Sequence, residues 1–427
     1  MRIRRTLPPA AAPLRLRDLW SGFKGFFTGD RYLGRLEDGI REYFGARHVW
    51  FASSGKAALY LILRSLRSLR PGRSEVLIPA YTCFSVPSAI VRAGLKVALC
   101  DIDASSLDFD GALLKKSINA NTLCVMPNHL FGIPSGMEGI MDLCRDRGVF
   151  VLEDAAQAMG GMRDGKMLGT IGDVGFFSLG RGKPVTCGSG GIIVTNSDVM
   201  ARAIEEEFLR LSSPGKGEDV REYIKAVMMS LFVHPSLYWI PAVLPFLKLG
   251  RTFFDSQFPV TRLSPVKAGL GLDWEKRLER SMNVRRQRAS ALCRSLGVAG
   301  WVDGASPVPY LRLPVIVGSR DLKKNICTAA AKKGLGITGM YPSAINEVPE
   351  IAGQFSGRQF PGARLVAERL IAVPVHEFVS ERDQEEMVRL LSAGQCAAMV
   401  CPTLPVPGFS TSGTALLRQA VFPMCPS

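Results

Sequence analysis

Short apolar runs alternate with helical periodicity between residues 49 and 195. The segments Ala57–Leu69, Ser85–Ala93 and Gly136–Arg147 place apolar residues at helical spacing. The runs between them are bounded by Gly, Pro and Asp and have the length of buried strands: Val76–Ile78, Val97–Cys100, Thr122–Met126, Val149–Leu152 and Ile192–Val194. This alternation predicts an α/β domain whose sheet is mostly parallel and covered by helices on both faces. Ligands are then expected at the carboxyl ends of the strands.

A second, smaller α/β region follows. It opens with Pro265–Leu296, predicted as one long helix, and continues with strand and helix signals through Val308–Val317, Asp321–Lys333 and Glu381–Leu391. We therefore predict an N-terminal arm at 1–33, a large domain at 34–225, an insertion at 226–264 and a smaller C-terminal domain at 265–393. Residues 394–427 are rich in Pro, Ser, Thr and Gly, and we expect them to form a poorly ordered tail.

The insertion contains a long uncharged stretch. Ala226–Leu247 has no Asp, Glu, Lys or Arg, and a helix of roughly 20 apolar residues can span a bilayer. Pro235, Pro241 and Pro245 argue against a continuous lipid-facing helix, because each removes a backbone donor. Two interpretations stay open. The stretch packs on the core or across a dimer interface, or Ala226–Leu249 is a peripheral membrane contact that uses Tyr238 and Trp239 between Lys225, Lys248 and Arg251.

The chain is basic, with a formal net charge of +15 over 427 residues. This balance either favours nucleic acid, anionic lipid or phosphorylated substrates as partners or reflects a solvated basic surface. No Arg/Lys run with interleaved aromatic residues is present, which counts against nucleic acid. The ten cysteines form no Cys-x-x-Cys pair and no His stands at zinc-finger spacing, so neither disulfides nor a metal site is expected. We expect a cytoplasmic protein without a signal peptide, with any membrane contact at the inner face.

A buried strand ends in an acid at Phe150–Gln157. This position aims the carboxylate of Asp154 into the cleft at the strand ends. A pyridoxal cofactor needs such a group, because a carboxylate beside the pyridine nitrogen keeps the nitrogen protonated and makes the ring an electron sink. The alternative is a strand-end Asp that caps the following helix.

A glycine-rich turn that carries one lysine follows the next strand. Phe176–Lys183 leads from apolar residues into Gly180-Arg181-Gly182-Lys183, and Gly188–Gly191 precedes another strand. Glycines permit a tight backbone around a planar ligand, and Lys183 can form an imine with an aldehyde when its pKa is lowered. The alternative is a solvated surface lysine.

A third element, Ser53–Leu59, turns from a short strand at His48–Phe51 into an apolar helix through small residues. Backbone amides at such a helix N-terminus form an anion site that suits the phosphate of a cofactor. Ordinary helix capping is the alternative.

Together these elements resemble the sugar aminotransferases of the DegT/StrS family within the fold-type I pyridoxal-phosphate enzymes. The resemblance covers about residues 34–393. It rests on Ser53–Leu59, Ile78–Thr82, Asp101–Asp103, His129–Gly132, Glu153–Gln157, Gly172–Asp173 and the segment 177–191, with Pro374–His376 in the small domain.

The resemblance implies a homodimer whose large domain at 34–225 binds pyridoxal 5'-phosphate. It implies that Lys183 is the Schiff-base lysine, that Asp154 lies at the pyridine nitrogen and that Gln157 lies near the ring hydroxyl. Gly55, Lys56 and Ser178 are implied as the residues around the phosphate.

The sequence departs from the family pattern around the cofactor. Lys56 stands where Thr is usual, and Cys83 stands where an aromatic residue commonly stacks on the ring. Phe84 is the substitute stacking residue, provided that the backbone shifts. Pro184 and Ser189 also replace the usual residues, in segments that contact substrate and the dimer partner.

Lys183 favours transamination, because family members that remove a sugar hydroxyl carry histidine at this position. His129 is not that residue. It is a strand-end residue that either lines the cofactor side of the cleft or is a core histidine with both nitrogens bonded.

The sequence thus predicts transfer of an amino group from an amino-acid donor, glutamate, to a nucleotide-linked keto-sugar for a cell-surface polysaccharide or glycan. One alternative is a catalytically inactive scaffold protein of a membrane polysaccharide machine, motivated by the departures. The other is a pyridoxal-phosphate enzyme that acts on an amino acid or a lipid-linked substrate, which the apolar insertion would suit.

Overall fold

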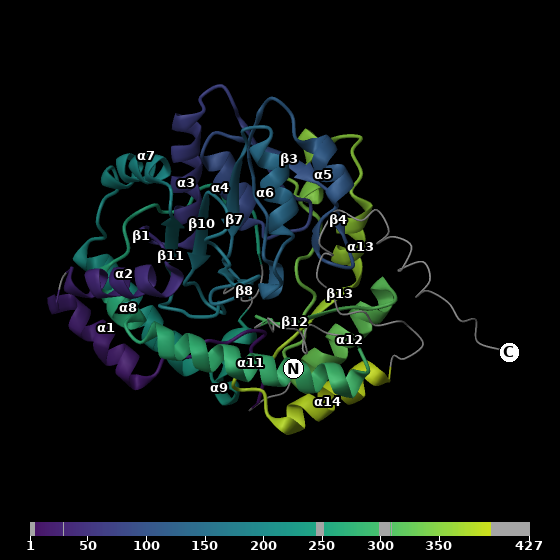
Figure 1. Ribbon diagram of the computed structural model, residues 1–427. Helices are drawn as coiled ribbons and strands as arrows, with labels where there is room; N and C mark the ends of the chain where they lie inside the picture. The colour runs from purple at the N-terminus through teal and green to yellow at the C-terminus, as the bar shows by residue number, and fades with distance from the viewer. Residues whose placement is uncertain (1–4, 29, 245–251, 299–307, 309, 394–427) are drawn as a thin grey trace.

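The computed structural model describes residues 5–28, 30–244, 252–298, 308 and 310–393. The large domain is built on a seven-stranded sheet of order β1-β11-β10-β7-β6-β2-β3 (Figure 1). The strands from β10 to β3 run parallel, whereas β11 is antiparallel to both neighbours: the connection through residues 179–190 returns the chain beside β10 without a crossover helix. The mostly parallel sheet is therefore confirmed. Its strands are β1 (His48–Ala52), β2 (Glu75–Pro79), β3 (Lys96–Cys100), β6 (Thr122–Val125), β7 (Phe150–Asp154), β10 (Val174–Ser178) and β11 (Gly191–Thr195).

Helices cover both faces of the sheet, as the pattern predicts. Trp50, Phe176 and Ile193 belong to the core under α3, α4 and α7, and the alternate residues Phe51 and Ile192 belong to the core on the opposite face. On that opposite face, α5 and α6 cover the strands from β7 to β3, and α2 covers the β1 side. The bounds are α2 (Arg31–Phe44), α3 (Gly55–Leu69), α4 (Ser85–Arg92), α5 (Gly111–Ser117), α6 (Met137–Arg145) and α7 (Asp198–Leu209).

The small domain contains a two-stranded antiparallel sheet with helices packed on it. Helix α11 runs from the large domain toward this sheet (Figure 1). The elements are β12 (Leu313–Ile316), β13 (Leu370–Val373), α12 (Arg320–Lys333), α13 (Pro361–Arg369) and α14 (Glu381–Ser392). Shorter pieces are β4 (Ile102–Asp103), β5 (Asp108–Phe109), β8 (Met162–Arg163), β9 (Lys166–Met167), η1 (Leu130–Gly132), η3 (Ile345–Glu347) and η4 (Ala352–Phe355).

The prediction of one helix over Pro265–Leu296 is wrong. The segment forms α10 (Pro265–Gly271) and α11 (Trp274–Leu296), with Leu272 and Asp273 between them. Helix α10 packs backbone to backbone on α1 (Leu16–Thr28), since a Cβ on Gly269 would lie 2.4 Å from the carbonyl oxygen of Ser21. This packing fixes the direction of α10 independently of α11. The apolar pattern does not show the break, because α10 buries its last residues and α11 buries its first residue, Trp274.

The N-terminal residues are not a free arm. Residues 6–11, which we call the N-terminal strap, cross from the insertion to the small domain and are bonded along their backbone to distant segments. Two strap residues donate: the N–H of Thr6 bonds the carbonyl of Pro235 at 2.9 Å, and the N–H of Leu7 bonds the carbonyl of Gly334 at 2.8 Å. Two strap carbonyls accept from side chains: Pro8 from Nε2 of His376 at 2.8 Å, and Ala11 from Nη2 of Arg285 at 3.0 Å.

The insertion continues from α8 (Lys216–Phe232) into α9 (Pro235–Ala242). Ala226 of α8 belongs to a buried core cluster on which Tyr223 and Met229 pack, and Pro235 of α9 is buried, whereas most of the described insertion is partly or fully exposed. Whether its exposed side contacts a dimer partner or a membrane stays a prediction. Among the described residues, no helix is long and apolar enough to cross a membrane. Residues 245–251, with Lys248 and Arg251, and the tail predicted at 394–427 lie outside the described residues.

Candidate active site

The carboxyl ends of β7 and β10 bring two predicted site residues together. Asp154 is the last residue of β7 and pairs in register with Phe176 of β10. Lys183 lies in the turn that follows β10. The turn passes through Gly182 with φ +70°, a conformation that costs glycine little, and the N–H of Lys183 donates to the carbonyl of Gly180 at 3.3 Å. The structure thus brings Lys183 near Asp154, and their roles toward a cofactor stay predictions.

Burial dominates the electrostatics of this pair. It lowers the pKa of the Lys183 amine; Cys83 and Asp154 raise that pKa, and the positive charge of Arg312 lowers it further. Burial also raises the pKa of the Asp154 carboxyl, and Lys183, the N–H of Ala156 and His129 oppose this effect. A lowered pKa increases the fraction of free amine, which is the form that attacks an aldehyde.

An anion cradle lies at the N-terminus of α3. Oγ of Ser54 caps the helix by accepting from the N–H of Ala57 at 3.1 Å. A Cβ on Gly55 would stand 3.1 Å from Oγ of Ser178, so a larger residue would fill the space beside that hydroxyl. Helix amides and a hydroxyl around a space that only glycine leaves open fit a phosphate. Two of the predicted phosphate residues, Gly55 and Ser178, are thus adjacent.

Lys56, the third predicted phosphate residue, is already paired. Its Nζ lies 3.0 Å from Oδ2 of Asp255 and 4.5 Å from the centre of the Phe258 ring. This ion pair lowers the pKa of the Asp255 carboxyl, against the raising effect of burial. Lys56 therefore ties α3 to the segment after the insertion, and its contribution to phosphate binding stays a prediction.

Two tyrosines form a wall beside Gln157. Nε2 of Gln157 donates to the hydroxyl of Tyr341 at 3.0 Å, and the Tyr341 ring lies 5.5 Å from that of Tyr81. Phe84 is buried and stacks on Tyr341 with ring centres 6.5 Å apart, while Cys83 is close enough to Lys183 to affect its pKa. The role of Phe84 against the cofactor ring stays a prediction, since its ring already has a stacking partner.

Arg312 is a cleft residue that the sequence reasoning missed. Its Nε has no hydrogen-bond partner among the described residues, and its Nη1 only meets Sδ of Met340 at 3.1 Å. No carboxylate of the described residues forms an ion pair with it, although burial lowers its pKa. Burial raises the pKa of Tyr238, and the positive charges of Arg312 and Arg181 oppose this effect, which places α9 beside Arg312. The available signal was a single charge inside the apolar run Val308–Val317.

Of the two interpretations of His129, a cleft-lining residue or a core histidine with both ring nitrogens bonded, the structure fits the second. His129 is fully buried, its Nδ1 accepts from the N–H of Ser135 at 3.1 Å, and its Nε2 lies 2.9 Å from Oε2 of Glu153. Because Nδ1 accepts, Nε2 must carry a proton and donate to the carboxylate. Glu153 also accepts from the N–H groups of Gly169, Ile171 and Gly172 and so anchors the loop before β10.

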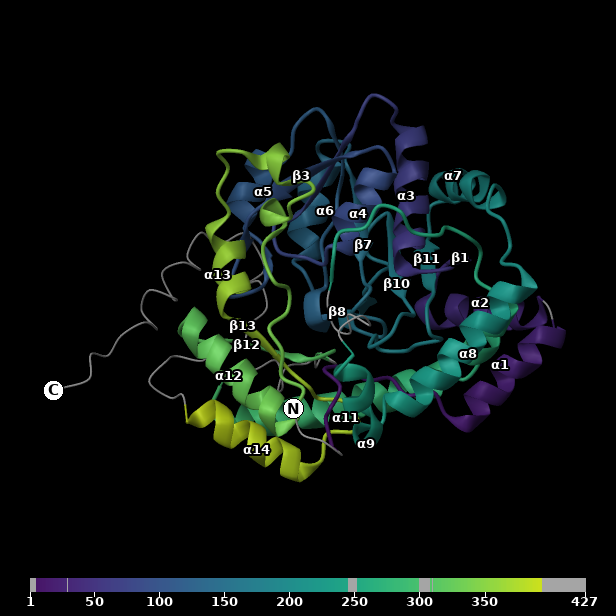
Figure 2. The ribbon, with the colours of Figure 1, turned by 180° about the vertical axis from the view of Figure 1, so that it is seen from behind.

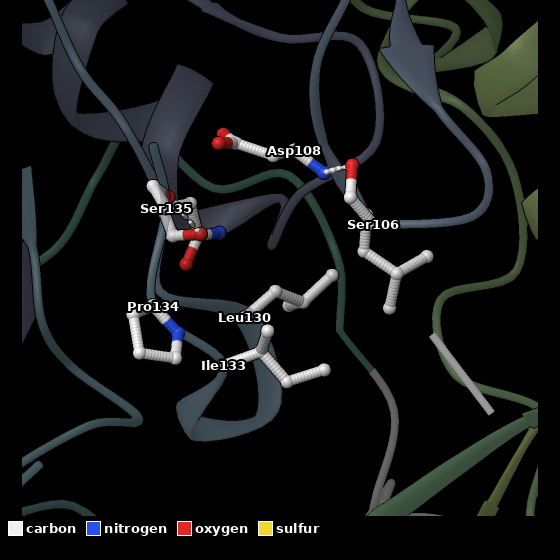
Figure 3. Close-up of a pocket in the computed structure, with 8 residues that line it drawn as sticks. Ser106, Asp108, Leu130, Ile133, Pro134 and Ser135 are labelled. Atoms are coloured by element: carbon white, nitrogen blue, oxygen red, sulfur yellow. Dashed lines mark hydrogen bonds between the residues drawn. The ribbon is translucent and has the colours of Figure 1, made fainter. Parts of the chain in front are cut away.

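Figure 3 shows a small pocket near this core that does not include Lys183 or Asp154. It is too narrow for a water-sized sphere and is lined by residues 106–108, 128, 130 and 133–135. Asp108 lies at its edge and accepts from the N–H groups of Gly136 at 2.6 Å and Phe109 at 2.8 Å. These bonds give Asp108 a role in holding the loops together.

A buried lysine near a strand-end carboxylate, with a space suited to a phosphate at the N-terminus of α3, is the arrangement that the resemblance implies for a fold-type I pyridoxal-phosphate aminotransferase. The chain belongs to the DegT/DnrJ/EryC1/StrS aminotransferase family, whose model matches residues 21–392. This membership confirms the family, the fold, the enzyme class and the pyridoxal-phosphate cofactor expected from the motifs.

Curated relatives match part of the chain. It is 33% identical over 273 residues to a GDP-perosamine synthase of Caulobacter vibrioides, covering 64% of this chain and 61% of the relative. It is 34% identical over 185 residues to the GDP-perosamine synthase of Vibrio cholerae, covering 43% of this chain and 49% of the relative. The chain thus spans about half to three fifths of the length of these relatives.

Solved structures match nearly the whole fold. PseC of Helicobacter pylori, an aminotransferase involved in pseudaminic acid biosynthesis, has a TM-score of 0.74 at 17% identity and covers 91% of this chain and 99% of its own. The sugar aminotransferase CalS13 of Micromonospora echinospora has a TM-score of 0.72 at 21% identity, covering 91% and 100%. The GDP-4-keto-6-deoxy-D-mannose-3-dehydratase of E. coli, with bound hydrated PLP, has a TM-score of 0.71 at 18% identity, covering 91% and 99%. Because a dehydratase shares the fold, the fold alone does not separate the two reactions.

Proposed function

We propose that this protein transfers an amino group from glutamate to a nucleotide-linked keto-sugar. The observation that carries the proposal is Lys183 beside Asp154 at the strand ends of a chain from this family. A lysine can exchange its imine with an amino donor, whereas the family members that remove a sugar hydroxyl carry histidine at this position. The GDP-perosamine synthases among the relatives support a nucleotide-linked sugar as the substrate class.

Pyridoxal phosphate, when bound, supplies an electron sink next to the reacting nitrogen. Lys183 accepts and returns a proton at Nζ, which the lowered pKa of its amine favours. Asp154 provides negative charge for the ring nitrogen, and Gly55 and Ser178 provide the site for the phosphate. Tyr341, fixed by Gln157, forms a wall that orients a planar ring and excludes water.

The amino donor needs a cation for its carboxylate, and Arg312 is the described side chain that supplies one. Its guanidinium lies near Lys183 and lacks an internal acid, so a bound carboxylate would satisfy it. This supports an acidic amino acid such as glutamate as the donor.

Replacement of Lys183 tests the proposal. In Lys183→Ala we expect loss of the visible absorbance of lysine-bound cofactor and a loss of turnover of roughly 100- to 10,000-fold. Lys166→Ala, which removes an exposed lysine of β9, is the matched control and should keep both. Absorbance spectra with and without glutamate, and mass spectrometry of the product with keto-sugar nucleotides, give the readouts. Turnover in Lys183→Ala at the wild-type rate would refute the assignment.

The same spectra distinguish an inactive scaffold, which would bind no cofactor or show no change with glutamate. The approach of Tyr238 in the apolar insertion to Arg312 favours a lipid-linked substrate as the second candidate. Measuring binding of a panel of nucleotide sugars separates the candidates, because a lipid-linked substrate predicts no nucleotide-dependent binding.

We further propose a homodimer that acts in the cytoplasm in the synthesis of a cell-surface polysaccharide or glycan. The family resemblance supports the dimer, and the free cysteines among the described residues suit a reducing compartment. Light scattering of the purified protein tests the dimer.

A further inference from the structure

Helix α1 is oriented against the usual rule for surface helices. Its buried residues are Asp18, Gly22 and Gly25, whereas Leu16, Trp20 and Phe27 are 85%, 58% and 78% exposed. An amphipathic surface helix normally turns its apolar stripe toward the core. Here the large apolar side chains lie on the outer face.

The inner face of α1 has no space for large side chains. A Cβ on Gly25 would lie 2.6 Å from the carbonyl oxygen of Pro265, and one on Gly22 would lie 2.5 Å from a methyl carbon of Leu270. Glycines therefore set a close approach of α1 to α10, and the aromatic stripe must face outward.

Helix α8 continues the exposed apolar surface. It lies beside α1 in both views of the molecule (Figures 1 and 2), where the hydroxyl of Tyr223 donates to the carbonyl of Leu19 at 3.0 Å. The Tyr223 ring contacts Phe23 with ring centres 6.3 Å apart and thus joins the two helices. We call the combined surface the α1–α8 face: Leu16, Trp20, Phe23 and Phe27 of α1 with Val220, Ile224, Met228 and Leu231 of α8, all exposed.

All charged side chains that α1 and α8 leave exposed are basic: Arg17, Lys24, Lys216, Arg221 and Lys225. Asp18 is buried, and the acids of α8 are less exposed than its cations: Glu222 pairs with Lys225 at 2.7 Å and with Lys267 at 3.3 Å, and Glu218 lies 3.8 Å from Arg221. Nζ of Lys24 lies 5.5 Å from the centre of the Trp20 ring. Apolar and aromatic side chains flanked by exposed cations are the composition of a helix surface that lies in a membrane interface.

We propose that the α1–α8 face docks on an anionic lipid bilayer. A bilayer accepts the apolar stripes into its interface, and its headgroups pair with the basic side chains. A second copy of the chain is a poorer occupant, because a two-fold contact would set exposed cations against one another without exposed acids on these helices. Leu237 of α9, which follows α8, and Val243 directly after α9 are also exposed and apolar.

Vesicle flotation of the full-length holoenzyme tests this surface. We expect the protein to float with vesicles of phosphatidylcholine and phosphatidylglycerol at low salt and to remain below vesicles of phosphatidylcholine alone. In Trp20→Ser/Phe27→Ser, binding should weaken by at least about 10-fold, because two large apolar side chains no longer enter the interface. The control Leu113→Ser/Val199→Ser removes exposed apolar residues of α5 and α7 and should bind like wild type.

A second variant and a spectroscopic readout address folding and contact separately. Lys24→Glu/Lys216→Glu changes two exposed cations, leaves the apolar residues in place and should lower anionic-vesicle binding several-fold, with an unchanged melting temperature. Lipids brominated on their acyl chains should quench the Trp20 fluorescence, measured as the difference between wild type and Trp20→Phe.

Absence of vesicle binding, or equal binding by the α1 and control variants, would overturn the proposal. Dissociation of a dimer by Trp20→Ser/Phe27→Ser without an effect on vesicles would assign the face to a second copy.

Discussion

Cys83 lies close to Lys183 at the position where the resemblance expected a stacking aromatic residue. It is partly exposed, and its Sγ lies 3.5 Å from Oγ1 of Thr252. We expect pyridoxal phosphate to slow alkylation of Cys83 by iodoacetamide several-fold, since the cofactor would cover the cleft. Cys327, which is partly exposed in α12, is the internal control, and burial raises its pKa. Peptide mapping by mass spectrometry gives both rates, and equal protection of the two thiols would place Cys83 outside the cofactor site.

Arg312 is expected to affect the donor step and not cofactor loading. In Arg312→Gln the cofactor absorbance should be retained, while the glutamate concentration that produces half of the spectral change rises roughly 10- to 100-fold, because a charged hydrogen bond is lost. Arg312→Lys should recover part of the affinity. A glutamate titration of the cofactor spectrum measures this directly. An unchanged midpoint in Arg312→Gln would remove Arg312 from the donor site, while leaving the assignment of Lys183 intact.

The sequence predicted those site residues that belong to continuous motifs. Asp154 and Ser178 end strands, Gly55 begins a helix and Lys183 lies in the turn after β10, and parallel strands bring such positions to one edge. Arg312 and Tyr341 come from the small domain, so their approach depends on packing between segments more than 100 residues apart. The pairing of Lys56 with Asp255 was missed for the same reason.

At the scale of elements, α1 and α10 depend on glycines at their contact. Gly25→Ala should lower the free energy of unfolding by about 1–3 kcal/mol, because the added methyl group meets the Pro265 carbonyl oxygen. Gly34→Ala in α2 is the matched control: nothing lies within 4 Å of the added Cβ, and alanine should stabilise the helix by about 0.5–1 kcal/mol. Urea unfolding followed by circular dichroism measures the two shifts. Equal shifts in the free energy of unfolding would show that the close approach of α1 and α10 does not contribute to stability.

The pattern of apolar residues identified most elements because strands and helices in the large domain bury complete faces. The apolar pattern did not identify the boundary or the orientation of a helix where burial does not follow the helical period. Helix α10 is buried almost all round, so the apolar pattern runs through its end, and only Gly271 and Asp273 mark the break before α11. The apolar stripe of α1 has a helical period, which does not reveal that this side faces solvent.

At the scale of the whole molecule, His376 connects acid stability to the N-terminal strap. Burial lowers its pKa to about 3, so the folded protein keeps it neutral while the unfolded chain takes up a proton near pH 6.5. Its stabilising contribution is therefore complete above pH 6.5 and declines as the pH falls toward 3, by up to about 1.4 kcal/mol per pH unit.

His376→Gln should make the acid decline of unfolding free energy shallower between pH 6.5 and 4, because the amide can still donate to Pro8 and does not titrate in this range. Urea unfolding at a series of pH values measures the slope. The exposed His234 serves as the control, and His234→Gln should keep the wild-type slope. If the His376 variant also kept that slope, the strap would not be the acid-sensitive contact.

The strap also sets an order of events during protein synthesis. Residues 6–11 leave the ribosome well before their partners at positions 235, 285, 334 and 376. The large domain can complete its sheet once residue 195 is available, whereas the strap must wait until residue 376 has emerged. Assembly of the two domains around the cleft is thus a late step, which is completed by a segment made before the sheet.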